Sequence, residues 1–160
     1  MKSKRAQTVS RRRFLAVATL GLCAPAVVLG VATASTGETL VTVYKSPTCG
    51  CCQGWVDYLR DEGFQVQTHD VADLNPIKAR VGLADPSLAS CHTALVDGYV
   101  VEGHVPADDI RRLLRERPPI VGITAPGMPQ LSPGMMSREP KGYDVLSFDE
   151  RGEVAVFSRH

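Results

Sequence analysis

The residues best suited to chemistry are three cysteines within four positions, Cys49, Cys51 and Cys52, in the stretch SPTCGCCQ. A fourth cysteine, Cys91, follows later in the chain. Such a cluster suits a disulfide staple, a thiol redox centre or a site for a soft metal ion. The staple is awkward, because adjacent Cys51 and Cys52 bridge each other only with strain. Two of the three clustered thiols would then need partners, and only Cys91 is available.

The spacing of Cys49 and Cys52 is C-x-x-C, which is typical of thiol exchange and also of metal binding. An exchange reaction needs one attacking and one resolving sulfur, and Cys51 would offer a third that traps the wrong disulfide. A soft metal ion gains from each added thiolate. We therefore favour a metal-binding protein, with a thiol–disulfide oxidoreductase using Cys49 and Cys52 as the alternative. No residue establishes catalytic turnover.

Other soft donors occur downstream. Met128 and Met135 lie in two Pro-Gly-Met units seven residues apart, and a thioether suits Cu(I) better than Zn(II) or Mg(II). Both methionines could instead cover an apolar rim. His104 follows an expected strand and is a candidate ligand. His92 adjoins Cys91, but strand alternation can point it away, while His69 and His160 are expected to be solvated.

These donors together, with no paired carboxylates nearby, indicate copper in its reduced state. Zinc stays an alternative, because four thiolates suit a closed tetrahedral site. The C-x-C-C spacing, however, differs from the paired C-x₂-C units of structural zinc sites.

Periodicity and turn residues indicate the elements that must position these side chains. Expected strands are 40–44, 64–68, 93–96, 99–101, 145–148 and 154–157. Expected helices begin near 52, 73 and 106 and end near 63, 81 and 118. The stretch 118–142 is rich in Pro and Gly and is expected as a long loop, a length that points to function or to a missed element.

The order β-α-β-α-β-β-α predicts an α/β, thioredoxin-like fold: a central mixed sheet with helices on both faces, plus a C-terminal β-hairpin. The three clustered cysteines then lie where the first strand meets the first helix, whose N–H groups stabilise thiolates. Cys91 lies in the loop entering the third strand, beside the same turn. We expect its sulfur to face the other three.

The N-terminal part resembles an export signal. Arg11-Arg12-Arg13 precedes an apolar run and an A-x-A exit at 32–34, which is the pattern of a twin-arginine signal peptide. We expect a signal over 1–34, discarded with Cys23, and one domain over 35–160. The apolar run is too short and too rich in Ala and Gly for stable membrane insertion. The expected location is an oxidising periplasm.

Charge excludes one class of partner. The whole chain has 18 Lys/Arg and 17 Asp/Glu. Residues 1–34 hold 6 of the 18 basic residues and no acidic one, so 12 basic and 17 acidic residues remain, a net charge of −5. A nucleic-acid partner would need a basic face. No nucleic-acid binding is therefore expected.

Three motifs also resemble a known family: YKSPTCGCCQGWVDYLRDEGF, SCHTALVDGYVVEGHVPADDIRRLL and PGMPQLSPGM. They are similar to the CopG-like family of small periplasmic copper-binding proteins, over nearly all of 40–157. The resemblance implies a thioredoxin-like fold, a role in copper resistance, and room for more than one copper ion. It implies partners such as another periplasmic copper carrier or an efflux component. The implied metal residues are Cys49, Cys51, Cys52, Cys91, His104, Met128 and Met135.

Overall fold

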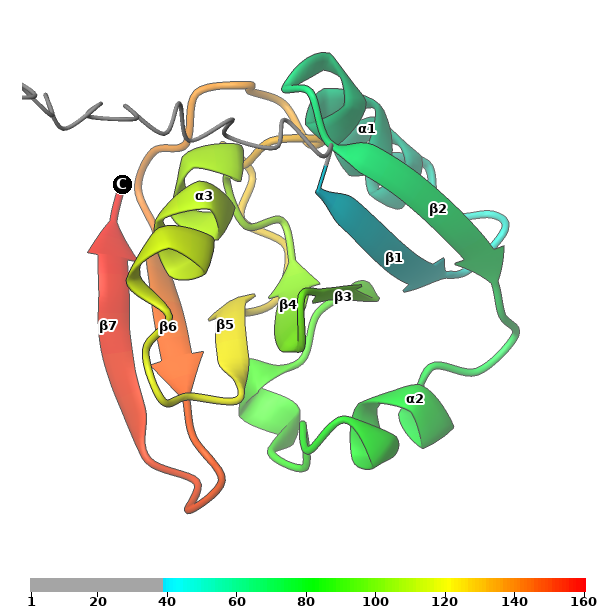
Figure 1. The fold of residues 1–160 in the computed structure, drawn as a ribbon. Helices are drawn as coiled ribbons and strands as arrows, with labels where there is room; N and C mark the ends of the chain where they lie inside the picture. The colour runs from blue at the N-terminus through cyan, green and yellow to red at the C-terminus, as the bar shows by residue number, and fades with distance from the viewer. Residues whose placement is uncertain (1–38) are drawn as a thin grey trace, which may run out of the picture. The chain divides into compact units, whose positions relative to one another are not determined.

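The structure is a computed structural model that describes residues 39–160 (Figure 1). The expected signal over 1–34, with Cys23, lies outside the described residues. The strands are β1 (Leu40–Lys45), β2 (Gln65–Asp70), β3 (His92–Val96), β4 (Tyr99–Gly103), β5 (Gly122–Ala125), β6 (Asp144–Phe148) and β7 (Val154–Arg159). The helices are α1 (Gly50–Asp61), α2 (Asn75–Arg80), α3 (Ala107–Glu116) and the short 3₁₀ helix η1 (Pro86–Leu88).

The seven strands form one mixed sheet in the order β2-β1-β3-β4-β5-β6-β7. The β1/β2 and β4/β5 pairs are parallel, each joined through a helix, and the other neighbours are antiparallel. Asp97 and Gly98 both have positive φ in the two-residue turn between β3 and β4, as a tight hairpin requires. The expected central mixed sheet and C-terminal hairpin are confirmed.

The two faces of the sheet carry different helices. α1 and α3 pack on one face, where Trp55, Leu59, Ile110 and Leu113 are fully buried in the main hydrophobic cluster. Burial of each Leu or Ile side chain contributes about 2 kcal/mol to folding. The segment from α2 to η1 covers the other face in a smaller cluster. Helices therefore cover both faces, as expected, and α1 is held firmly against the sheet.

Two elements differ from the sequence-based expectation. α1 begins at Gly50, with Cys49 as its N-cap and the Cys49 sulfur accepting the Cys52 N–H at 3.4 Å. β5 lies inside the stretch expected as a long loop, so that assignment was wrong. The first residue of β5, Gly122, lies so close to Val100 on β4 that a Cβ would collide with its backbone, so only glycine fits there. The spacing of apolar residues cannot predict a helix cap made by a sulfur, nor a strand that begins with a glycine packed against its neighbour.

The chain between β5 and β6 (yellow to orange in Figure 1) runs up to α1. Gly134, at φ 85°, packs directly on Trp55 and Gly54, where neither glycine has room for a Cβ. The loop is therefore seated on the first helix. Among residues 39–160 no helix has the length and apolar character needed to cross a bilayer.

Candidate metal centre

The cysteine cluster is built by the junction of β1 and α1. β1 ends at Lys45, and the Cys49 N–H donates to the Ser46 carbonyl at 3.2 Å, which closes a turn. Cys49 then caps α1, and Cys51 and Cys52 occupy its first turn. These sulfurs lie at the positive end of the helix dipole, which favours thiolates there.

Cys91 reaches the same place from the loop that enters β3. One sulfur from each of Cys49, Cys51, Cys52 and Cys91 lies within 4.8 Å of the others. The Cys51 sulfur is 3.5 Å from that of Cys49 and 4.0 Å from that of Cys91. The four sulfurs thus converge, while their role as ligands stays a prediction.

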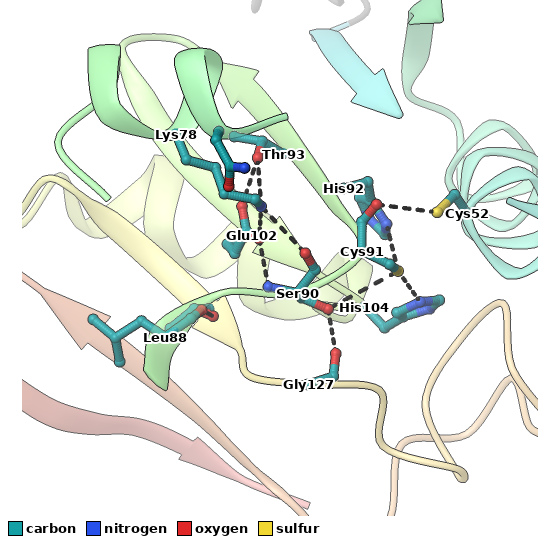
Figure 2. Close-up of polar contacts among 12 residues, drawn as sticks. Cys52, Lys78, Leu88, Ser90, Cys91, His92, Thr93, Glu102, His104 and Gly127 are labelled. Atoms are coloured by element: carbon teal, nitrogen blue, oxygen red, sulfur yellow. Dashed lines mark hydrogen bonds and ion pairs between the residues drawn. The ribbon is translucent and has the colours of Figure 1, made fainter. Parts of the chain in front are cut away.

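One disulfide is present, between Cys49 and Cys52, and Cys51 and Cys91 are free thiols. Among the described residues there is therefore no second bridge of the kind that a two-disulfide staple requires. The Cys52 sulfur lies 3.5 Å from the Cys91 carbonyl (Figure 2). It can donate a hydrogen bond to that oxygen only after reduction, because a disulfide sulfur carries no proton.

His104 comes to the cluster with a fixed orientation. Its Nε2 lies 3.2 Å from the Cys91 sulfur, and its Nδ1 lies 2.8 Å from the Pro133 carbonyl. A carbonyl only accepts, so Nδ1 carries the proton and Nε2 presents a lone pair to the sulfurs. A backbone carbonyl behind an imidazole is how metal-binding histidines are commonly oriented.

His92 is the residue that sequence reasoning undervalued. Its Nδ1 lies 3.4 Å from the Cys91 sulfur, so the expectation that alternation can turn it away was wrong. Its ring is fully buried, packs 4.4 Å from the Trp55 ring, and has no partner for Nε2. The signal available in the sequence was its place directly after Cys91.

The electrostatics of the pocket favour neutral donors in the metal-free state. Burial, with a smaller contribution from Cys51, raises the pKa of Cys91 to about 12. Burial lowers the pKa of His92 well below its usual value, helped by His104 and Lys78, and burial also lowers the pKa of His104. Both imidazoles are therefore neutral at pH 7 and can bind a metal, whereas Cys91 must first release a proton.

The methionine loop flanks the cluster. Gly127 pairs with Ser90 in an isolated bridge, which brings the residue before Met128 next to the residue before Cys91. Met128 is 55 % exposed. Met135 is half-buried and lines a shallow pocket with Gly54 and Tyr58 of α1. An exposed thioether covers little apolar surface. The two methionines as ligands stay a prediction.

The two other histidines lie elsewhere. His69 is exposed on the edge strand β2, where it stacks on Tyr44, as expected for a solvated residue. His160 was expected to be solvated, and this was wrong. Its Nε2 lies 2.8 Å from the Asp109 carboxylate, which also accepts the Ser158 hydroxyl, so His160 ties β7 to α3.

Sheet and site together define a class of protein: a small α/β protein with a cysteine and histidine cluster able to hold a metal ion at the head of its first helix. Residues 88–135 match the family described as "Protein of unknown function, DUF411". Two solved structures are similar, both described as copper resistance protein CopG, one as form 1 and the other as form 2. Each is 40% identical, with a TM-score of 0.70, over 77% of this chain and 98% of its own.

The chain therefore belongs to the CopG family, as the sequence motifs indicated. No curated protein shows significant similarity to it.

Proposed function

We propose that this protein binds copper as Cu(I) and sequesters or transfers it in copper resistance and homeostasis. Cys49, Cys51, Cys52 and Cys91 would supply thiolates, His104 an imidazole, and Met128 and Met135 thioethers at the rim. The observation that carries the proposal is the convergence of four sulfurs within 4.8 Å. The described copper resistance relatives support copper over zinc. The strand order β2-β1-β3-β4, with α1 after β1, supports a thioredoxin-like origin of the sheet.

Full thiolate ligation requires reduction of the Cys49–Cys52 bridge. Two electrons and two protons, supplied by a dithiol that is itself oxidised to a disulfide, convert the bridge into two thiols. Without reduction, the free donors of the cluster are Cys51, Cys91, His92 and His104. The redox state of the Cys49–Cys52 pair thus sets how many thiolates the metal can bind. With all four sulfurs reduced, the site has enough donors for more than one ion.

The residues of the chain have separate tasks in binding. Cys91 loses its proton as the metal arrives, so binding releases protons to solvent. His104 keeps its Nδ1 proton on the Pro133 carbonyl and offers Nε2 without reorienting. His92 and Trp55 pack beneath the site and keep water from its inner side.

Anaerobic titration of the reduced full chain with Cu(I) tests the proposal. We expect at least one tightly bound copper per chain by elemental analysis, retained against a Cu(I) chelator. Cys51→Ser should lose copper, whereas Cys23→Ser, which also removes one thiol but in the expected signal over 1–34, should not. Copper bound equally by both variants, or not bound by the unaltered chain, would contradict the proposal.

We further propose export by the twin-arginine route to a periplasm, where the physiological partner is another copper carrier or an efflux component. The signal-like residues 1–34 support the route. Arg11→Lys/Arg12→Lys/Arg13→Lys should keep the protein in the cytoplasm, as fractionation and immunoblotting would show. Unchanged export would exclude that route.

A thiol–disulfide oxidoreductase is the second candidate, and the Cys49–Cys52 disulfide at a helix N-terminus favours it. That activity needs only this pair. Insulin reduction that survives both Cys51→Ser and Cys91→Ser, and is lost with Cys49→Ser, would support an exchange enzyme over a copper protein.

A further inference from the structure

A buried ion pair lies on the face of the sheet opposite α1. Lys78 of α2 contacts Glu102 of β4, and the Glu102 side chain is fully buried. Removing two charges from water costs more than their attraction returns, unless further hydrogen bonds complete the pair. A pair of apolar residues would fill the same space at a lower cost in free energy. The further contacts of Lys78 and Glu102 should therefore show what the ion pair is for.

Those contacts converge on the residue before Cys91. The Ser90 N–H donates to Glu102 Oε1 at 2.6 Å, and Lys78 Nζ donates to the Ser90 carbonyl at 3.2 Å (Figure 2). Thr93 completes the network, since its hydroxyl donates to Glu102 Oε2 at 2.7 Å and lies 3.0 Å from Lys78 Nζ. Both backbone polar groups of Ser90 are thus bound by the two charged side chains.

Close packing and two hydrogen bonds also restrain the backbone around Ser90. Gly103 has φ 72°, and a Cβ at this position would lie 2.5 Å from the Ser90 Cβ. On the other side, the Gly127 N–H donates to the Ala89 carbonyl at 3.0 Å, and the Ser90 hydroxyl donates to the Gly127 carbonyl. The ion pair therefore completes the restraint on a segment that other contacts hold only in part.

We propose that Lys78 and Glu102 are positioning residues that hold the Ser90 peptide and thereby place the Cys91 sulfur against the sulfurs of α1. This inference rests on the proposed function in one respect, namely that Cys91 is a metal ligand. The placement of the sulfur itself is a property of the metal-free chain. It can therefore be measured without copper.

The measurement is the equilibrium of the Cys51–Cys91 pair with glutathione. In the full chain carrying Cys23→Ser, Cys49→Ser and Cys52→Ser, only these two thiols remain, with sulfurs 4.0 Å apart in the unaltered protein. The ratio of reduced to oxidised glutathione is set, and the fraction of chains with a Cys51–Cys91 disulfide is measured. This fraction gives the effective concentration of one thiol at the other. Lys78→Met/Glu102→Leu removes both charges at similar volume, and we expect it to lower this concentration about tenfold, since such values depend steeply on placement.

Two further variants separate positioning from stability. Lys78→Met/Glu102→Gln restores an oxygen acceptor for the Ser90 N–H and should recover part of the loss. It also supplies the measurement if the Leu variant does not fold. Ile110→Val, on the buried side of α3, should lower the free energy of unfolding without changing the effective concentration. A folded Lys78→Met/Glu102→Leu chain within twofold of its parent, or an equal loss in Ile110→Val, would overturn the proposal.

Cu(I) binding by the same variants, with Cys49 and Cys52 restored, separates this inference from the proposed function. If the ion pair is a positioning device for a metal ligand, Lys78→Met/Glu102→Leu should weaken Cu(I) affinity while Ile110→Val does not. If the sulfur equilibrium responds but the unaltered chain binds no copper, the positioning stands and the copper proposal fails. If copper binds but the sulfur equilibrium does not respond, the positioning fails alone.

Discussion

At the scale of single residues, the site combines donors whose protonation is set by burial. The Cys91 thiol is half-buried beside Cys51 and keeps its proton far above neutral pH. The two imidazoles are neutral for the same reason. A metal ion entering this pocket therefore meets lone pairs from nitrogen at once, and a thiolate only after a proton leaves.

The pH dependence of Cys91 reactivity follows from its pKa of about 12. Only the thiolate attacks iodoacetamide, so in the metal-free protein the alkylation rate of Cys91 should rise about tenfold per pH unit from pH 7 to pH 10. An ordinary thiol would level off near pH 9. Mass spectrometry of peptides after timed alkylation measures the rate, with glutathione as the reference. A plateau below pH 10 would contradict the burial argument.

Replacement of His104 tests its part in binding. His104→Gln removes the Nε2 lone pair that faces Cys91, and we expect Cu(I) affinity to fall about 10- to 100-fold in a chelator competition. His69→Gln is the matched control, because that ring is exposed on β2, stacks on Tyr44 and is not among the close donors of the cluster. Equal affinities for the two variants would remove His104 from the ligand set.

At the scale of elements, local pattern was enough for most of the sheet. Periodicity and turn residues predicted β3, β4 and the greater part of α1. The cap at Cys49 was missed because a sulfur acceptor is not a usual cap residue, and β5 was missed because Pro and Gly surround it. What pattern cannot supply is the approach of elements distant in sequence, such as Pro133 to His104, or Lys78 to Ser90.

The seating of the methionine loop on α1 depends on Gly134. Its φ is 85°, and a Cβ would collide with the Trp55 backbone. Gly134→Ala should therefore lower the free energy of unfolding by about 2–4 kcal/mol, through backbone strain plus displacement of the loop. Gly142→Ala is the matched control, because Gly142 has a similar φ of 76° but open space around its Cβ position. It should cost only the strain, about 1 kcal/mol.

Urea unfolding followed by tryptophan fluorescence compares the two variants, since Trp55 is the single tryptophan. Gly134→Ala should also shift the emission of the folded state, because the loop can no longer pack as closely against Trp55. Equal losses in the two variants would mean that the loop does not depend on contact with α1.

At the scale of the whole molecule, metal, disulfide and fold are linked. The cysteines come from two segments that are adjacent only in the folded chain, so an unfolded chain cannot present the same four-sulfur site. A ligand that binds the folded state alone stabilises it in proportion to the logarithm of its excess over the dissociation constant. The Cys49–Cys52 bridge removes two sulfurs from the metal, so the oxidised chain should gain less from copper than the reduced chain.

Calorimetry of four samples measures this linkage: oxidised and reduced full chain, each with and without Cu(I) under nitrogen. With copper at about a thousandfold excess over the dissociation constant, the reduced protein should gain about 4 kcal/mol of stability, less whatever the unfolded thiols bind. The resulting rise in Tm should be several degrees and should be clearly smaller for the oxidised protein. Equal shifts would mean that copper binds without the Cys49–Cys52 pair, so that Cys51, Cys91 and the histidines are sufficient and the disulfide belongs to a separate thiol chemistry.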